Sequence, residues 1–311
     1  MLLAPAERTT LPRYEVAGPV AAASIVVLGG ISAHRHVCAH AADATPGWWE
    51  GIAGHGCAVD PSRHRVVSFD FLDGGRAADG RPAREVSTHD QADALAAMLD
   101  ELAVERVGAI VGASYGGMVA LAFAERYPDR ADRLVVIGAA HRSHPMATAL
   151  RVIQRRIVEL GLETGRHDAA LALARQLGIT TYRSAREFGA RFDHARTRGA
   201  DGGLAFPVES YLAAHGRRFA AAWRPERFLA LSLSADLHAI DASRIRTPVT
   251  LVAAADDAIV PRDEVVALSR ALGGPSHIVD LEPRTGHDTF LTAPDLIGPI
   301  VARAIATIDH D

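Results

Sequence analysis

A Gly-x-Ser-x-Gly sequence at residues 112–116 constrains the fold of this chain more than any other feature. Residues 107–111 are apolar and predict a buried strand, and residues 118–127 predict a helix that stops before Pro128. The same pattern also arises by chance in surface loops, so its context matters. Between a strand and a helix it forms a tight turn that strains the central serine and raises its hydroxyl above the end of a sheet. The sequence therefore predicts that Ser114 is a nucleophile.

Short apolar runs recur along the chain and predict a sheet of buried strands. The runs cover residues 24–30, 65–69, 107–111, 134–138, 248–254 and 277–281. Helical patterns lie between several of them, at 89–102 and 263–272, and a last helix is predicted at 295–308. This alternation is typical of an α/β fold with a mainly parallel sheet and helices on both faces.

The interval 142–238 interrupts the alternation, because it carries helical patterns and no run that predicts a strand. The patterns cover residues 148–160, 167–177, 209–223 and 226–237. We expect a helical lid at 142–238, inserted into an α/β core of residues 1–141 and 239–311. Such an insertion would cover the carboxyl ends of the strands, where Ser114 emerges.

Composition excludes several other classes of protein. The 311 residues are 49% hydrophobic and 23% charged with a net charge of -4, which is typical of a globular domain and gives no basic surface for nucleic acid. No apolar stretch approaches the roughly 18 residues of a membrane span, and no signal peptide is visible. Cys38 and Cys57 could form one bridge, but so few cysteines fit a reducing compartment, so we expect a cytoplasmic protein.

A serine hydroxyl becomes nucleophilic only when a base takes its proton, and that base needs an acid to orient it. Asp257 follows the apolar run at 249–254, and His287 follows the last run. The order Ser, Asp, His, with each residue just after a strand, is typical of α/β hydrolases. We predict a triad of Ser114, Asp257 and His287. Asp256 is the alternative acid, although a solvated turn residue is its simpler interpretation.

Acyl chemistry also needs N–H donors for the oxyanion of the intermediate. One donor is predicted at the backbone N–H of Tyr115, directly after the nucleophile. We assign the second to the backbone N–H of Ile31, in the loop after the first apolar run.

A cluster of histidine and cysteine side chains precedes the second apolar run. Its members are His34, His36, Cys38 and His40. Imidazole and thiolate groups bind zinc, but this spacing matches none of the usual zinc patterns. We therefore predict no metal centre.

Several segments resemble one family of acyltransferases. They are Trp-Trp at 48–49, Gly-x-Gly-x-x-x-Asp at 54–60, Ser-Tyr-Gly-Gly-Met at 114–118, Gln-Arg at 154–155, Tyr-Arg-Ser at 182–184, Val-Glu-Ser-Tyr-Leu at 208–212 and Gly-His-Asp-x-Phe-Leu at 286–291. On these segments the chain, from about Ser24 onward, resembles the homoserine O-acyltransferases, the acetyl- and succinyltransferases of methionine biosynthesis.

The resemblance implies an α/β-hydrolase fold with a homodimeric assembly. It also implies ping-pong acyl transfer from succinyl-CoA or acetyl-CoA to the hydroxyl of L-homoserine, with acyl-CoA as co-substrate and no further cofactor. By motif match Arg183 would bind the carboxylate of homoserine and Asp288 its ammonium, which are the two charges that a zwitterion requires. Their simpler interpretations are a surface charge for Arg183 and a helix-entry acid or supporting partner for Asp288. Arg155 is a weaker candidate for substrate binding.

The sequence does not decide which acyl-CoA is the donor or which molecule accepts the acyl group. A succinyl donor needs an extra cation for its free carboxylate, for which Arg262 near Asp257 is a candidate, whereas an acetyl donor needs none. Residues 71–76 and the short N-terminal β segment depart from the family pattern and leave donor choice open. L-Serine is an alternative acceptor. A hydrolase that uses water, and a non-catalytic binding protein of the same fold, are the competing hypotheses.

Overall fold

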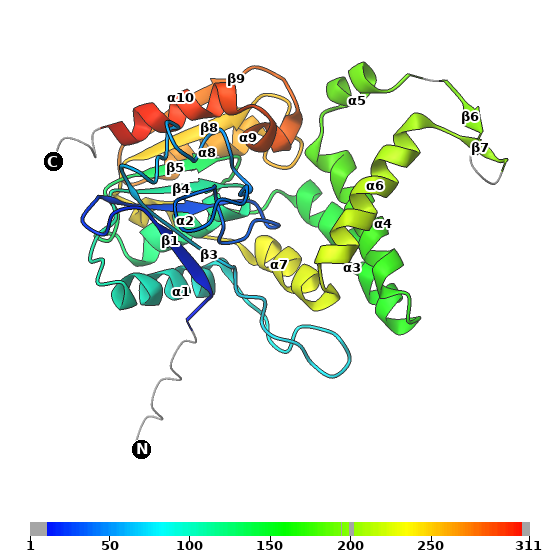
Figure 1. Ribbon diagram of the computed structural model, residues 1–311, viewed down its shortest axis with the longest axis horizontal. Coiled ribbons are helices and arrows are strands. Elements are labelled where there is room, and N and C mark those ends of the chain that lie inside the picture. The colour runs from blue at the N-terminus through cyan, green and yellow to red at the C-terminus, as the bar shows by residue number, and fades with distance from the viewer. Residues whose placement is uncertain (1–10, 194, 199–201, 307–311) are drawn as a thin grey trace.

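The computed structural model describes residues 11–193, 195–198 and 202–306, and one seven-stranded sheet lies at its centre (Figure 1). The strand order is β1-β3-β2-β4-β5-β8-β9, and every neighbouring pair is parallel except β1 and β3. The strands span Tyr14–Ala17 (β1), Ser24–Leu28 (β2), Arg65–Phe69 (β3), Ala109–Ala113 (β4), Leu134–Ile137 (β5), Val249–Ala254 (β8) and Ser276–Leu281 (β9). The mainly parallel sheet predicted from the sequence is confirmed, and the carboxyl ends of its parallel strands share one edge.

Strand β1 is the one strand of this sheet that the apolar runs do not predict. It has four residues, of which only Ala17 is buried. It lies at the edge of the sheet and pairs Tyr14 with Phe69 of β3. A half-buried edge strand leaves no continuous apolar run in the sequence. The other six strands each lie within or overlap a predicted run.

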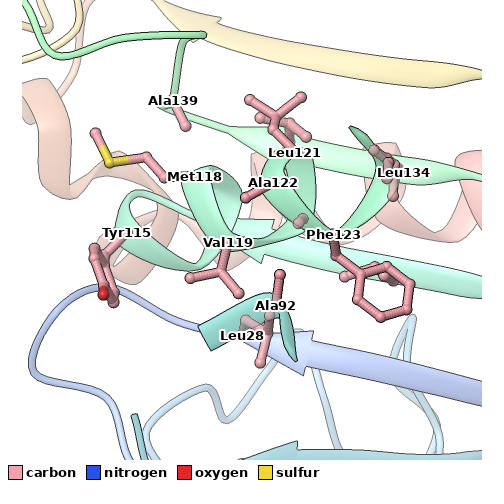
Figure 2. Packing of buried hydrophobic residues seen from close by; sticks show 14 of the residues in the cluster. Leu28, Ala92, Tyr115, Met118, Val119, Leu121, Ala122, Phe123, Leu134 and Ala139 are labelled. Carbon is pink, nitrogen blue, oxygen red and sulfur yellow. The ribbon is translucent and has the colours of Figure 1, made fainter. Parts of the chain in front are cut away.

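The two faces of the sheet bury separate hydrophobic clusters. In β2, Val26 and Leu28 belong to one cluster. Ile25 and Val27 belong to the other, because successive side chains of a strand point to opposite faces. The first face is covered by α1 (Thr88–Glu101), α2 (Tyr115–Arg126) and α8 (Arg262–Ala271), and the second by α10 (Pro294–Ile305) and loop residues between 37 and 59. Figure 2 shows α2 in the first cluster, with Leu28 of β2 and Ala92 of α1 beside it.

The chain between β5 and β8 forms a helical segment, residues 145–237, that we call the insert. It contains α3 (Pro145–Glu163), α4 (His167–Tyr182), α5 (Ala185–Arg191), β6 (Thr197–Arg198), β7 (Leu204–Ala205), α6 (Pro207–Ala222) and α7 (Pro225–Leu237). Its two ends meet, because Arg142 forms an isolated β-bridge with Ala239. In Figure 1, α4, α5 and α6 extend away from the sheet, whereas α7 lies closer to it. Among the described residues, no helix combines the length and the apolar character needed to cross a membrane, and this includes α3 with its 19 residues.

The insert corrects the expectation that this interval contains no strand. Strands β6 and β7 pair antiparallel, with Thr197 opposite Ala205 and Arg198 opposite Leu204. Each strand has two residues and is largely exposed, so no apolar run marks it in the sequence. Helix α5 is also absent from the predicted helices, since seven residues with none buried leave little periodicity.

Glycines allow α2 to approach the sheet closely. A Cβ added at Gly116 would lie 2.3 Å from the carbonyl oxygen of Leu28 in β2, and one at Gly117 would lie 2.8 Å from the Cβ of Ala139. The backbone of Gly116 also donates a hydrogen bond to the carbonyl of Gly29 at 2.9 Å. Any side chain at Gly116 therefore forces β2 and α2 apart.

We expect Gly116→Ala to destabilise the fold, because its new methyl group would overlap a backbone carbonyl that cannot rotate away. Overpacking of this kind lowers the free energy of unfolding by about 1–3 kcal/mol. The matched control is Gly189→Ala in α5, where an added Cβ meets no atom within 4 Å; it should be neutral or stabilising by up to about 1 kcal/mol. Urea denaturation of both variants measures this, and equal stabilities would contradict the packing argument.

Candidate active site

Ser114 lies at the sharp turn between β4 and α2. Its backbone has φ 53° and ψ -119°, a left-handed conformation that a serine adopts only under strain. The turn is held by a hydrogen bond from Ser114 N–H to the carbonyl of Ile137, at 2.7 Å. The predicted order of strand, tight turn and helix is confirmed, and it presents the hydroxyl at the carboxyl edge of the sheet.

Two hydrogen bonds connect Ser114 with His287 and Asp257. The Ser114 Oγ lies 2.7 Å from His287 Nε2, and His287 Nδ1 lies 2.7 Å from Asp257 Oδ2. Asp257 follows β8, and His287 lies in a 3₁₀ turn, η2 (Gly286–Asp288), after β9. With Nδ1–H donating to the carboxylate, Nε2 is free to accept the serine proton. The structure thus brings the three predicted residues together in the geometry that a Ser-His-Asp triad requires.

The Asp257 carboxylate is fixed by its own loop. Its second oxygen, Oδ1, accepts hydrogen bonds from the backbone N–H groups of Ile259 and Val260, at 2.8 and 2.9 Å. Asp256, the alternative acid, is only partly buried, and neither of its carboxylate oxygens has a hydrogen-bond partner in the described part of the chain. Of the two neighbours, the structure places Asp257 against His287.

Burial and charge act in opposite directions on His287. Burial lowers the pKa of the imidazole, but the charge and hydrogen bond of Asp257, helped by Asp288, outweigh burial and raise the pKa above the ordinary value of 6.5. The imidazolium that forms when His287 accepts a proton is therefore stabilised.

The two predicted oxyanion donors lie beside Ser114. Ile31 and Tyr115 both line the same cavity as Ser114. A Cβ added at Gly30 would lie 3.8 Å from the Ser114 Cβ, which shows how closely this loop approaches the nucleophile. Neither backbone N–H has a hydrogen-bond acceptor among the described residues, so both are available to a ligand.

A cavity of about 250 Å³ opens over Ser114. The core contributes Trp48, whose indole also packs over Gly29, together with Phe290. The insert contributes Arg151, Arg175 and Tyr182. Arg155 and Arg183 of this segment are candidates from the sequence, whereas Arg175 is not. No motif distinguishes the arginines of α3 and α4 that face the cavity from those that face solvent.

Asp288 lines the cavity, and Arg183 lies directly beside it. The Arg183 Nε is 3.2 Å from Asp288 Oδ2 but is not aligned for a hydrogen bond. Arg183 is outside the cavity lining, although its side chain keeps 13% exposure. Burial raises the pKa of Asp288, an effect that the Arg183 and His287 charges oppose. Arg155 does not line the cavity either and pairs with Asp236 at 2.6 Å.

The histidine cluster lies against Glu15, an acid that is not among the residues predicted from the sequence. His36 Nδ1 and His40 Nε2 lie 2.8 and 3.0 Å from Glu15 Oε1 of β1, and these three groups could together hold a metal ion. Cys38 is not part of this group, and burial raises its pKa to about 12, so its sulfur is a thiol at neutral pH. The two contacts with Glu15 attach the loop to the edge of the sheet. The absence of a metal centre stays a prediction.

Known proteins share the sequence pattern and the fold of this chain. A family model described as the alpha/beta hydrolase fold matches residues 24–294. A homoserine O-succinyltransferase from Xanthomonas campestris pv. campestris is 42% identical over 296 residues, covering 95% of this chain and 79% of the relative. A serine O-succinyltransferase from Stenotrophomonas maltophilia is 33% identical over 331 residues, covering 93% of this chain and 90% of the relative.

Solved structures share the same architecture. Esterase E22 superposes with a TM-score of 0.83 at 18% identity, covering 94% of this chain and 93% of that chain. A homoserine O-acetyltransferase from Bacillus anthracis superposes with a TM-score of 0.82 at 17% identity, covering 94% and 91%. These matches confirm the predicted fold class, and at such identities they carry no information about substrate.

We expect the reactivity of Ser114 to follow the protonation of His287, because only the neutral imidazole accepts the serine proton. Inactivation by a fluorophosphonate should be slow at low pH and accelerate as the pH rises through a midpoint above 6.5, since the His287 pKa is raised. The measurement is the second-order inactivation rate constant as a function of pH.

The two neighbouring aspartates provide the control. Asp257→Asn should move the midpoint to lower pH and slow inactivation, because it removes the charge that stabilises the imidazolium. Asp256→Asn should leave the midpoint unchanged, since its carboxylate has no partner within the described residues. A midpoint that responds to Asp256→Asn and not to Asp257→Asn would contradict this assignment.

Proposed function

This chain belongs to the homoserine O-acyltransferase family of the α/β-hydrolase superfamily, and on that premise we propose that it transfers an acyl group from an acyl-CoA to the hydroxyl of L-homoserine. The observation that carries the proposal is the pair of 2.7 Å contacts joining Ser114, His287 and Asp257 beside a cavity that also holds Asp288. A nucleophile and an anionic group for an amino acid's ammonium thus share one site.

In the first half-reaction Ser114 takes the acyl group. Its Oγ attacks the thioester carbonyl carbon while His287 Nε2 takes the hydroxyl proton. The N–H groups of Ile31 and Tyr115 stabilise the oxyanion. The carbon–sulfur bond then breaks, and the CoA sulfur leaves with the proton from His287, which yields an acyl ester on Ser114.

In the second half-reaction the acyl group moves to the acceptor. The homoserine hydroxyl attacks the ester carbonyl as His287 takes its proton. The bond to Ser114 Oγ breaks, and Oγ recovers the proton from His287. The products are O-acyl-homoserine and the free enzyme, so the cycle is ping-pong.

The neighbouring charges of Arg183 and Asp288 support an amino-acid acceptor. A zwitterion carries an ammonium and a carboxylate on the same carbon, and the 3.2 Å pair offers the opposite charges side by side. We assign the ammonium to Asp288, which lines the cavity, and the carboxylate to Arg183. L-Serine, one methylene shorter, is the second candidate acceptor because a serine O-succinyltransferase is 33% identical to the chain.

The family also supports three finer assignments that we include in the proposal. They are a role in methionine biosynthesis, a cytoplasmic location and a homodimeric state. Sedimentation velocity of the purified protein tests the last of these directly.

We expect thiol release from acyl-CoA to depend on the acceptor. Acyl-CoA alone should release about one thiol per active site, because the acyl-enzyme persists until homoserine accepts the acyl group. Adding homoserine should give continuous release, followed with a thiol reagent and by mass spectrometry of the ester. Full-rate release without acceptor would instead identify a hydrolase.

Ser114→Ala should slow this reaction on the order of 10³-fold or more, because no acyl-enzyme forms. Ser243→Ala, an exposed serine in the turn η1 (Ala242–Arg244), is the control and should retain full activity. Unchanged activity in Ser114→Ala would favour a site elsewhere in the chain.

We expect Asp288→Asn to weaken the acceptor step most, although it also removes a charge that helps to raise the pKa of His287. Loss of a charged partner for the ammonium should raise the KM for homoserine about 10- to 100-fold. The initial thiol burst should keep its amplitude, because the donor does not use Asp288. Asp263→Asn, an exposed acid on α8, is the control. Equal loss in both half-reactions would argue against an acceptor role.

A further inference from the structure

The predicted oxyanion donor at Tyr115 belongs to a peptide unit whose other side is held by hydrogen bonds. The carbonyl of Ser114 and the N–H of Tyr115 lie in the same plane, because the peptide bond is planar. That carbonyl accepts hydrogen bonds from the backbone N–H groups of Gly117 and Met118, at 2.9 and 3.1 Å. The direction of the Tyr115 N–H therefore depends on this carbonyl and on the Cα atoms of Ser114 and Tyr115.

The Cα of Tyr115 is anchored through its own side chain. The Tyr115 hydroxyl lies 2.6 Å from the Oγ of Ser234 in α7, and the two residues are 2% and 0% exposed. The Tyr115 ring packs edge-on against Phe71, with 4.8 Å between the ring centroids. Moving the side chain would separate two buried hydroxyls, which is unfavourable. The ring contact and the hydroxyl contact together hold the side chain in one position.

The Tyr115 hydroxyl is an anchoring group and not a reacting one. Burial raises the pKa of Tyr115, and hydrogen bonds with Ser234 and Gln91 only partly oppose this effect, so the phenol stays neutral. Gln91 of α1 binds the backbone of Leu72 with both its amide oxygen and its amide nitrogen, at 2.9 Å each. Gln91 thus connects Tyr115 with the core, whereas Ser234 connects it with the insert.

Helix α7 directs Ser234 and its neighbouring polar residues to opposite sides. Leu231 lies three residues before Ser234, on the same face of the helix, and belongs to the core cluster. Ser232 and Asp236 lie on the opposite side, where their oxygens accept hydrogen bonds from Arg155 of α3 at 3.0 and 2.6 Å. Helix α7 is therefore fixed between the rest of the insert and the turn that carries the nucleophile.

We infer that Ser234 is a positioning residue for the oxyanion hole, because through the Tyr115 hydroxyl it fixes the Tyr115 N–H against the developing oxyanion. This inference rests on the proposed function, in which Ser114 carries the acyl group. It gives the insert a part in stabilising the transition state, besides its contribution to the cavity wall. Oxyanion donors act through preorganisation, so a displaced N–H slows the reaction without weakening the binding of homoserine.

The first test is Ser234→Ala, assayed by thiol release with homoserine and with whichever of succinyl-CoA and acetyl-CoA the wild-type protein uses faster. Its kcat should fall about 10-fold, a part of the roughly 100- to 1000-fold that loss of a whole oxyanion donor costs. The KM for homoserine should not change.

Inactivation by a fluorophosphonate gives a second readout that needs neither substrate. The phosphoryl oxygen occupies the same oxyanion hole, so Ser234→Ala should lower the rate constant at every pH. The pH midpoint that reports the protonation of His287 should stay where it is in the wild-type protein. A variant that disturbed the triad would move this midpoint.

Tyr115→Phe removes the other half of the hydrogen bond and should give the same loss as Ser234→Ala. The double variant should be no slower than the slower single variant, because the two hydroxyls act as one unit. It also guards against misfolding, since replacing both partners of a buried hydrogen bond by apolar groups leaves neither hydroxyl unpaired.

Two matched controls remove a hydroxyl of the same kind elsewhere. Ser232→Ala, on the opposite side of α7, removes a buried serine that bonds to Arg155. Tyr127→Phe, at the other end of α2, removes a hydroxyl that donates to Asp93 at 2.7 Å. Both controls should keep kcat and the inactivation rate constant close to the wild-type values.

Several outcomes would overturn the inference. They are no loss in Ser234→Ala, an equal loss in Ser232→Ala, losses that multiply in the double variant, a moved pH midpoint, and a raised KM for homoserine with an unchanged kcat. If neither donor acylates the wild-type protein, the proposed function itself fails, and the inactivation assay still decides the role of Ser234. Wild-type acyl transfer that Ser234→Ala does not slow overturns only this inference.

Discussion

The close contact between helix α2 and strand β2 determines where the reacting groups can lie. Because Gly116 has no side chain, its backbone can approach Leu28 and donate a hydrogen bond to the carbonyl of Gly29. This close approach requires a sharp turn at the residues before Gly116. In that turn Ser114 adopts a strained left-handed backbone conformation, which the hydrogen bond from its N–H to the carbonyl of Ile137 holds in place. The other groups are arranged around this fixed point: Ile31, the predicted oxyanion donor, follows β2, and Asp257 and His287 follow β8 and β9.

We place the reacting groups in the core and the charges for substrate binding in both parts of the chain, with Asp288 in the core and Arg183 in the insert. The core supplies the groups assigned to bond making and breaking, each at the carboxyl end of a strand or the start of α2. The insert supplies charge, through Arg151, Arg175 and Arg183, and an aromatic surface through Tyr182. The two parts meet where Arg183 contacts Asp288, the residue next to the base. In a largely apolar cavity, where charge is poorly screened, a few such groups can decide which substrate is held.

Features with a local pattern could be predicted from the sequence, and features that depend on packing could not. The parallel strands are continuous apolar runs, and the order of Ser114, Asp257 and His287 after successive strands is visible in the chain. The edge strand β1 and the exposed β6–β7 pair are too short and too exposed to leave a pattern. Arg175 resembles any other helical arginine until α3, α4 and α6 are packed together, and only the structure shows that it lines the cavity while Arg262 binds Asp280 instead.

The meeting of the two ends of the insert at Arg142 and Ala239 has an evolutionary consequence. Strands β5 and β8 are direct neighbours, paired from Leu134 with Val249 onward, so the sheet is complete whatever chain connects them. The entropy of closing a connection grows only slowly with its length. The insert can therefore change in length or sequence without breaking the pairing of the sheet, as long as α7 keeps the side chains, such as Leu231 and Ala235, that pack in the core. Changes within this one contiguous stretch can thus alter the insert's side of the cavity over Ser114 and leave the sheet intact.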